Sequence, residues 1–136
     1  MQRERVEFLH RSWPADPAQL SVIRRQLAQW LAPLALTEDE IADVVLAVDE
    51  AAANVVRHAY GPGESGAVEL TLWTEPGTLY IEVVDHGQWR PPAAEPVEGG
   101  RGIGLMNSMA EAVMIHFDQR GSRVLLRHRV AGDRPR

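Results

Sequence analysis

The sequence predicts an α+β domain, a two-layer sandwich in which helices cover one face of a mixed, largely antiparallel sheet. Two helical patterns follow one another near the amino terminus, whereas the strand patterns occur as hairpins. Helices grouped in this way favour a sheet covered on one face over an alternating parallel arrangement. The 136 residues, 45% of them hydrophobic, are enough for one domain with one core.

The first half of the chain predicts a strand followed by two helices. Alternation over residues 6–12 predicts a short strand that ends at Trp13 and Pro14. Asp16 then provides an N-cap for a helix over residues 17–32. Thr37 and Glu40 form a capping box for a helix over residues 38–59. The expected buried stripe of this second helix consists of Ile41, Val44, Val45, Val48, Ala52 and Val55.

The second half predicts two hairpins separated by a loop and a helix. Alternating runs at residues 67–73 and 79–84 predict the first hairpin. Residues 88–101 are rich in proline and glycine and predict a long loop, which in a compact domain is usually functional or disordered. A third helix is expected over residues 102–111, and a closing hairpin over residues 113–117 and 123–130.

Composition excludes several chemistries. All 14 basic residues are arginine and cysteine is absent, which excludes a P-loop lysine, Schiff-base chemistry, disulfides and thiolate nucleophiles. The 19 acidic residues give a net charge of −5, which argues against direct nucleic-acid binding. No apolar run reaches the ~18 residues of a membrane span, and the charged start is unlike a signal peptide. We expect a soluble, cytoplasmic domain with no membrane partner.

The second predicted helix contains a candidate metal and catalytic pair. Glu50 and Asn54 are four residues apart and therefore lie on one helix face. Carboxylate and amide oxygens suit Mg²⁺, which usually keeps waters and binds substrate phosphates. The carboxylate is also able to take a proton from an attacking hydroxyl. Taken by itself, the pair is more typical of an exposed polar stripe, although the residues between are alanines, which suggests a helix packed on more than one side.

Two further candidates follow later in the chain. Asp85 and Gly87 end a predicted strand, where a buried aspartate can accept a hydrogen bond from an adenine amino group beside a glycine backbone. Alone, the pair is equally an ordinary strand-to-loop turn. Gly100, Gly102 and Gly104 precede a predicted helix, whose N-terminal N–H groups bind phosphate without lysine. Alone, these glycines are equally a flexible linker.

Together, the three motifs resemble the GHKL ATPases, whose ATP site is the Bergerat fold, also called the histidine-kinase-like ATPase fold. Residues 48–60 are similar to the N-box of the RsbW family of anti-sigma-factor serine kinases, and residues 101–113 to their second glycine box. The resemblance implies a Mg²⁺ ligand at Asn54 and a general base at Glu50. It also implies an ATP-binding set made of Asn54, Asp85, Gly87, Gly100, Arg101, Gly102 and Gly104.

The resemblance also implies a function. It predicts an anti-sigma factor that uses ATP and Mg²⁺ to phosphorylate a serine of a STAS-domain antagonist, and that forms a homodimer. Residues 89–92 resemble those of related domains that are joined to a PP2C-type phosphatase domain in the same chain. We therefore expect one GHKL domain over 1–136, either free-standing or excised from a multidomain regulator. One alternative is a non-catalytic ATP-binding switch. Another is a histidine-kinase catalytic domain, which would need an upstream phosphoacceptor helix pair that this chain has no room for.

Overall fold

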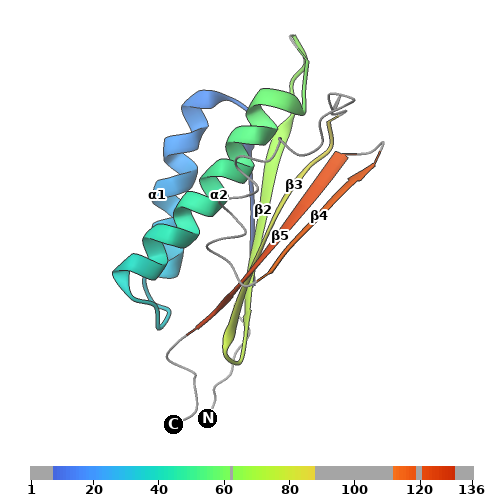
Figure 1. Ribbon diagram of the computed structural model, residues 1–136. Helices are drawn as coiled ribbons and strands as arrows, with labels where there is room; N and C mark the ends of the chain where they lie inside the picture. Colours follow the sequence, from blue (N-terminus) through green and yellow to red (C-terminus); the bar gives the residue numbers. More distant parts are fainter. Residues whose placement is uncertain (1–7, 62, 88–111, 119–120, 131–136) are drawn as a thin grey trace.

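The computed structural model describes residues 8–61, 63–87, 112–118 and 121–130, and within them it confirms the two-layer α+β sandwich (Figure 1). Helices α1 and α2 lie side by side on one face of the sheet. The sheet order is β1-β2-β3-β5-β4, and every neighbouring pair of described strands is antiparallel. The elements are β1 (Phe8–Pro14), η1 (Pro17–Gln19), α1 (Leu20–Leu31), α2 (Glu38–His58), β2 (Ala67–Glu75), β3 (Thr78–Asp85), β4 (Ala112–Asp118) and β5 (Gly121–Arg129).

Both helices begin at the caps that the sequence predicts. The Asp16 carboxylate accepts the Ala18 N–H at 2.9 Å, and the first turn after it is a 3₁₀ helix that leads into α1. At α2, the Thr37 hydroxyl accepts the Glu40 N–H at 3.0 Å, and Glu40 Oε1 accepts the Thr37 N–H at 2.9 Å. The capping box is therefore complete, and two N–H groups that an α-helix leaves unpaired are satisfied.

Strand β1 extends beyond the alternating residues, through Trp13 to Pro14, where the sequence predicts its end. Trp13 pairs with Val68, and Pro14 pairs with Ala67 at the end of the strand. Since β1 lies at the edge of the sheet, a residue without an N–H is tolerated at its terminus. Trp13 is only 7% exposed and its ring lies 6.2 Å from that of Trp30 on α1, so burial of this ring favours the longer strand.

The core lies between α1, α2 and one face of the sheet. Strands β2 and β3 alternate between buried and half-buried residues, and the buried set faces the helices. This core set includes Val68, Leu70 and Leu72 of β2, Leu79, Ile81 and Val83 of β3, Ile23, Leu27 and Leu31 of α1, and Val44, Val48 and Val55 of α2. Asp85 comes two residues after Val83 and therefore ends this same buried face with a carboxylate.

The opposite face of the sheet bears polar and aromatic side chains. Arg123 forms an ion pair with Glu82 at 3.1 Å, and the rings of Trp73 and Tyr80 stack with centroids 5.2 Å apart. Among the described residues, both helices lie on the other side (Figure 1). Within the same residues, no helix has the length and apolar character needed to cross a membrane.

The remaining predictions concern the second half of the chain. The closing hairpin is confirmed as β4 and β5, which pair from Ala112 with Arg127 to Asp118 with Gly121. The expected loop at 88–101 and helix at 102–111 lie outside the described residues.

The capping box makes a testable contribution to stability. The backbone hydrogen bond from Thr37 is the largest cause that lowers the pKa of Glu40 from its usual 4.5, and His128, with Nε2 3.5 Å from Glu40 Oε2, adds to it. A carboxyl with a lowered pKa in the folded state stabilises the fold above its unfolded pKa and loses that effect as pH falls. We expect Glu40→Gln to cost about 0.3–1 kcal/mol at pH 7, because the Thr37 N–H then loses its charged acceptor beside the helix N-terminus.

Urea denaturation of the protein and of Glu40→Gln at neutral pH and well below pH 4.5 measures this. The difference in unfolding free energy should shrink at the lower pH. Glu38→Gln is the matched control, since it removes a carboxylate from the same helical turn but leaves the capping box intact. Equal losses for the two variants at pH 7, or a Glu40→Gln difference that does not change with pH, would contradict the assignment.

Candidate functional site

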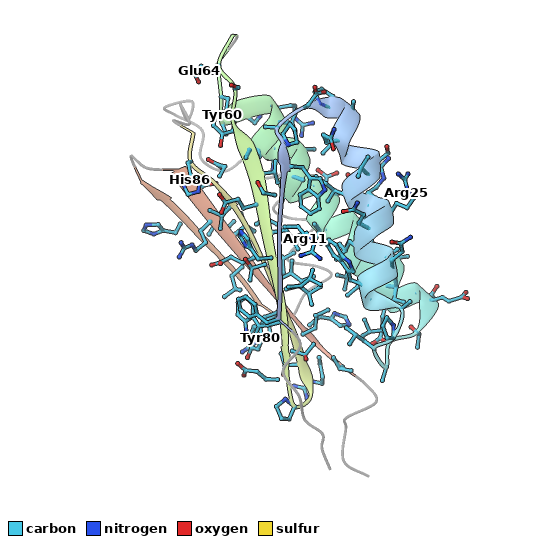
Figure 2. All side chains as sticks on the ribbon, turned by 180° about the vertical axis from the view of Figure 1, so that it is seen from behind. Arg11, Arg25, Tyr60, Glu64, Tyr80 and His86 are labelled. Carbon is cyan, nitrogen blue, oxygen red and sulfur yellow. The ribbon has the colours of Figure 1, made fainter. Side chains whose placement is uncertain are left out.

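The carboxyl-terminal ends of α2 and β3 meet at one end of the molecule. A methyl group built on Gly87, just after β3, would lie 1.9 Å from the carbonyl oxygen of Ala59, which caps α2. Figure 2 shows Tyr60 and His86, which follow these two elements, near the same end of the sheet. The helix that bears Glu50 and Asn54 is therefore in direct contact with the segment that bears Asp85 and Gly87.

Asp85 is a buried carboxylate with identified donors. It is 1% exposed, its Oδ2 accepts the Ser122 hydroxyl at 2.5 Å, and its Oδ1 accepts the Gly87 N–H at 2.9 Å. Burial of a charged group is costly unless hydrogen bonds satisfy it, so these donors are what permit an aspartate at this position. The Gly87 bond closes a local turn that holds the carboxylate against its own backbone.

Glycine is required at Gly87 for a reason that the sequence does not show. The close approach to the Ala59 carbonyl leaves no room for any Cβ at residue 87. We predicted this glycine from the access that it gives to an adenine base, whereas the structure shows that it first allows β3 to end against α2. Access for an adenine base would be a second requirement for glycine at this position, and it applies only if a nucleotide binds there.

Ser122 is a site residue that sequence reasoning missed. The sequence pattern leaves Ser122 between the two predicted strands of the closing hairpin, 113–117 and 123–130, but the residue belongs to β5 and pairs with Asp85 of β3. The preceding residue, Gly121, has a φ of +135°, and a Cβ there would lie 2.0 Å from the Asp85 carbonyl oxygen. A glycine with this backbone conformation lets β5 start tightly against the end of β3. No local signal links Ser122 to Asp85, because the two are 37 residues apart.

The polar row on α2 lies at the margin of the core. Glu50 and Asn54 are half-buried, whereas Ala51, Ala52 and Val55 beside them are buried. The Asn54 side-chain oxygen accepts a hydrogen bond from Arg57 Nη2 at 3.1 Å. The row is therefore not a fully exposed stripe, and the oxygen predicted to bind a metal ion already faces a cation.

The third predicted group lies outside the described residues. Gly100, Arg101, Gly102 and Gly104 all belong to residues 88–111. The described part of the chain contains no cluster of three or more His, Cys, Asp or Glu side chains able to hold a metal ion. The Asn54 oxygen is of the ligand type that suits Mg²⁺, an ion that usually keeps several waters and binds substrate phosphates.

The chain is similar to a known domain family and to several known proteins. The model of the histidine kinase-like ATPase domain family matches residues 13–128. The serine-protein kinase RsbW of Bacillus subtilis (strain 168) is 27% identical over 128 residues, which cover 83% of this chain and 80% of that protein. The anti-sigma F factor of Clostridium botulinum (strain Eklund 17B / Type B) is 28% identical over 134 residues, or 90% of each chain.

A solved structure extends the comparison to the fold. The RsbU and RsbW domains of a Mycobacterium tuberculosis protein match with a TM-score of 0.75 and 27% identity, over 95% of this chain and 33% of that one. These relatives confirm the predicted resemblance to RsbW proteins. The family match includes α2, β3 and most of β5, the elements that position Asn54, Asp85 and Ser122. The chain belongs to the histidine kinase-like ATPase domain family.

Proposed function

We propose that this domain is an anti-sigma factor and an ATP-dependent serine kinase that phosphorylates a STAS-domain antagonist. The names of two relatives, a serine-protein kinase and an anti-sigma factor, support both halves of the proposal. The observation that carries the proposal is the buried Asp85 carboxylate. It accepts hydrogen bonds from Ser122 and from the Gly87 N–H, in a turn after β3 that lies against the end of α2. An ATPase domain of this family binds ATP, and Asp85 is the acceptor that we assign to the adenine amino group.

The chemistry proposed for α2 follows from its two half-buried polar residues. Asn54 holds Mg²⁺ through its side-chain oxygen, which requires Arg57 to release that oxygen. The ion would neutralise negative charge on the transferred phosphoryl group. Glu50, one helical turn earlier, accepts the proton of the attacking serine hydroxyl. The phosphates are held by the backbone N–H groups of Gly100, Gly102 and Gly104 and by the side chain of Arg101.

The proposed partners are a sigma factor, a STAS-domain antagonist and a second copy of this domain. A PP2C-type phosphatase domain in cis is a further proposal, supported by the M. tuberculosis chain, which contains an RsbU domain together with its RsbW domain. In that arrangement residues 1–136 form one GHKL domain of a larger regulator. We place the protein in the cytoplasm, where sigma factors act, and assign it no direct nucleic-acid contact.

Removal of the proposed metal ligand tests the Mg²⁺ site. We expect Asn54→Ala to weaken ATP binding in the presence of Mg²⁺ by at least about tenfold, since even residues that only support a metal ligand contribute 10–100-fold to metal affinity. Calorimetry with and without Mg²⁺ measures the effect. Arg57→Ala is the matched control, because it breaks the same side-chain pair but keeps the Asn54 oxygen. An equal loss in both variants would show that the pair matters and that Asn54 is not a metal ligand.

Adenine selectivity tests Asp85. We expect Asp85→Asn to weaken ATP binding by about 1–3 kcal/mol, the cost of leaving a buried donor or acceptor unpaired, and to lose the preference for ATP over GTP. Competition binding with both nucleotides measures this preference. Asp49→Asn, which removes a carboxylate paired with Arg24 between the two helices, should leave the preference unchanged. A retained preference for ATP in Asp85→Asn would exclude Asp85 as the adenine acceptor.

The kinase half of the proposal depends on Glu50. We expect Glu50→Gln to lower the rate of antagonist phosphorylation by roughly 10²–10⁴-fold, because it removes the proton acceptor but keeps the shape of the side chain. ATP affinity and sigma-factor binding should change little, and Glu75→Gln at the exposed end of β2 should affect none of the three. A normal rate with normal affinity would favour the non-catalytic switch over the kinase.

A further inference from the structure

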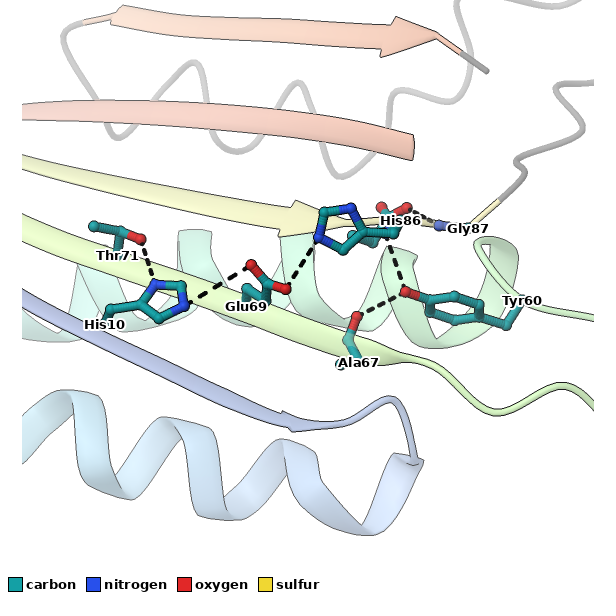
Figure 3. A network of polar contacts seen from close by, with 8 residues as sticks. His10, Tyr60, Ala67, Glu69, Thr71, His86 and Gly87 are labelled. Atoms are coloured by element: carbon teal, nitrogen blue, oxygen red, sulfur yellow. Dashed lines mark hydrogen bonds and ion pairs between the residues drawn. The ribbon is translucent and has the colours of Figure 1, made fainter. Parts of the chain in front are cut away.

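Tyr60 connects three elements through one hydroxyl group. It lies two residues after the end of α2, directly after the capping residue Ala59. Its hydroxyl donates to the carbonyl oxygen of Ala67, the first residue of β2, at 2.9 Å. The same hydroxyl accepts the backbone N–H of His86, just beyond β3, at 3.1 Å (Figure 3). The end of the helix is thereby joined to the start of one strand and the end of the next.

The position of the Tyr60 ring is set by packing as well as by these bonds. A Cβ built on Gly66 would lie 2.1 Å from two atoms of the ring, so the ring rests directly on the Gly66 backbone. The Gly66 carbonyl in turn accepts the Ala15 N–H at 2.9 Å, which joins this turn to the end of β1. The hydroxyl is therefore presented to His86 from a side chain that has little freedom to move.

The peptide group between Asp85 and His86 is held on both of its polar sides. Its N–H is bonded to the Tyr60 hydroxyl, and its carbonyl oxygen lies against Gly121, where a Cβ would come within 2.0 Å. The His86 ring forms a hydrogen bond between its Nε2 and Glu69 Oε2 at 3.0 Å, on the face of the sheet opposite the helices (Figure 3). The orientation of this peptide group determines where the Asp85 side chain starts, and hence where its carboxylate lies.

We propose that Tyr60 is a positioning residue for adenine selectivity, which it maintains by fixing the peptide group that follows Asp85. The inference rests on the proposed ATP site and adds to it a residue that acts without touching the nucleotide. Tyr60 and Ala59 are consecutive, and both contact the segment of residues 85–87. The two contacts hold Asp85 in a fixed relation to α2, which bears the proposed metal ligand Asn54.

Removal of the hydroxyl tests the proposal. Tyr60→Phe keeps the ring on Gly66 but can neither accept the His86 N–H nor donate to the Ala67 carbonyl oxygen. We expect the ratio of ATP to GTP affinity to fall roughly two- to tenfold, the range that the loss of one neutral hydrogen bond, here the one to His86, produces. Gly66→Ala, which displaces the ring and keeps the hydroxyl, should lower the same ratio by an independent route. Competition binding measures the ratio, and thermal unfolding is recorded for each variant.

Tyr80→Phe is the matched control. It removes the hydroxyl of the other tyrosine in the chain, which stacks on Trp73 toward the opposite end of the sheet (Figure 2). Its nucleotide ratio should equal that of the unmodified protein. A purely structural role for Tyr60 would lower the melting temperature of Tyr60→Phe but leave the nucleotide ratio intact, and that result would overturn the proposal.

The outcomes also separate this inference from the proposed function. An unmodified protein that prefers ATP, together with a Tyr60→Phe variant that prefers it equally, would remove the role of Tyr60 and leave the ATP site standing. An unmodified protein without a preference for ATP would overturn adenine recognition by Asp85 and the role of Tyr60 together.

Discussion

The end of β3 is organised by the burial of one carboxylate. Asp85 continues the apolar face of the strand, and its charge is compatible with that position because Ser122 and the Gly87 N–H donate to it. The Ser122 donor depends on the register that pairs this residue with Asp85. The arrangement also depends on two glycines, since a Cβ at residue 87 would strike Ala59, which caps α2, and a Cβ at residue 121 would strike β3. The buried charge thus constrains the helix, both strands and the turn at once.

Helix α2 bears Glu50 and Asn54 of the candidate site and also contributes buried side chains to the core. Its buried side includes Ala47, Ala51 and Ala52, small residues that let the helix backbone lie near the sheet. Glu50 and Asn54 occupy the margin of that contact and are half-buried, so both side chains stay partly accessible to solvent. One helix therefore sets both the packing of the domain and the place where phosphate chemistry is proposed to occur.

Much of the fold follows from interactions that are local in sequence. The helix caps and the alternating strands were predicted correctly because they depend on neighbours two or three residues apart, or on alternate residues of a single strand. Of the stripe predicted for α2, Val44, Val48, Ala52 and Val55 are buried, whereas Ile41 and Val45 are only partly buried. The three motifs also identified the family, since their order and residue types are visible without any contacts. The end of β1 at Pro14 was also predicted, but a proline is tolerated there because the strand lies at the edge of the sheet, which only the tertiary structure shows.

The sequence by itself therefore determined the fold class, the two helices, the hairpins and the residue types of the candidate site. Tertiary structure alone decided that Ser122 would meet Asp85, that Gly87 would lie on Ala59, and that Tyr60 would reach His86. Each of these contacts joins residues between 26 and 37 positions apart, or the ends of two different elements. The physical reason is that strand register and helix placement are set by the packing of the whole core, which no short stretch of sequence specifies.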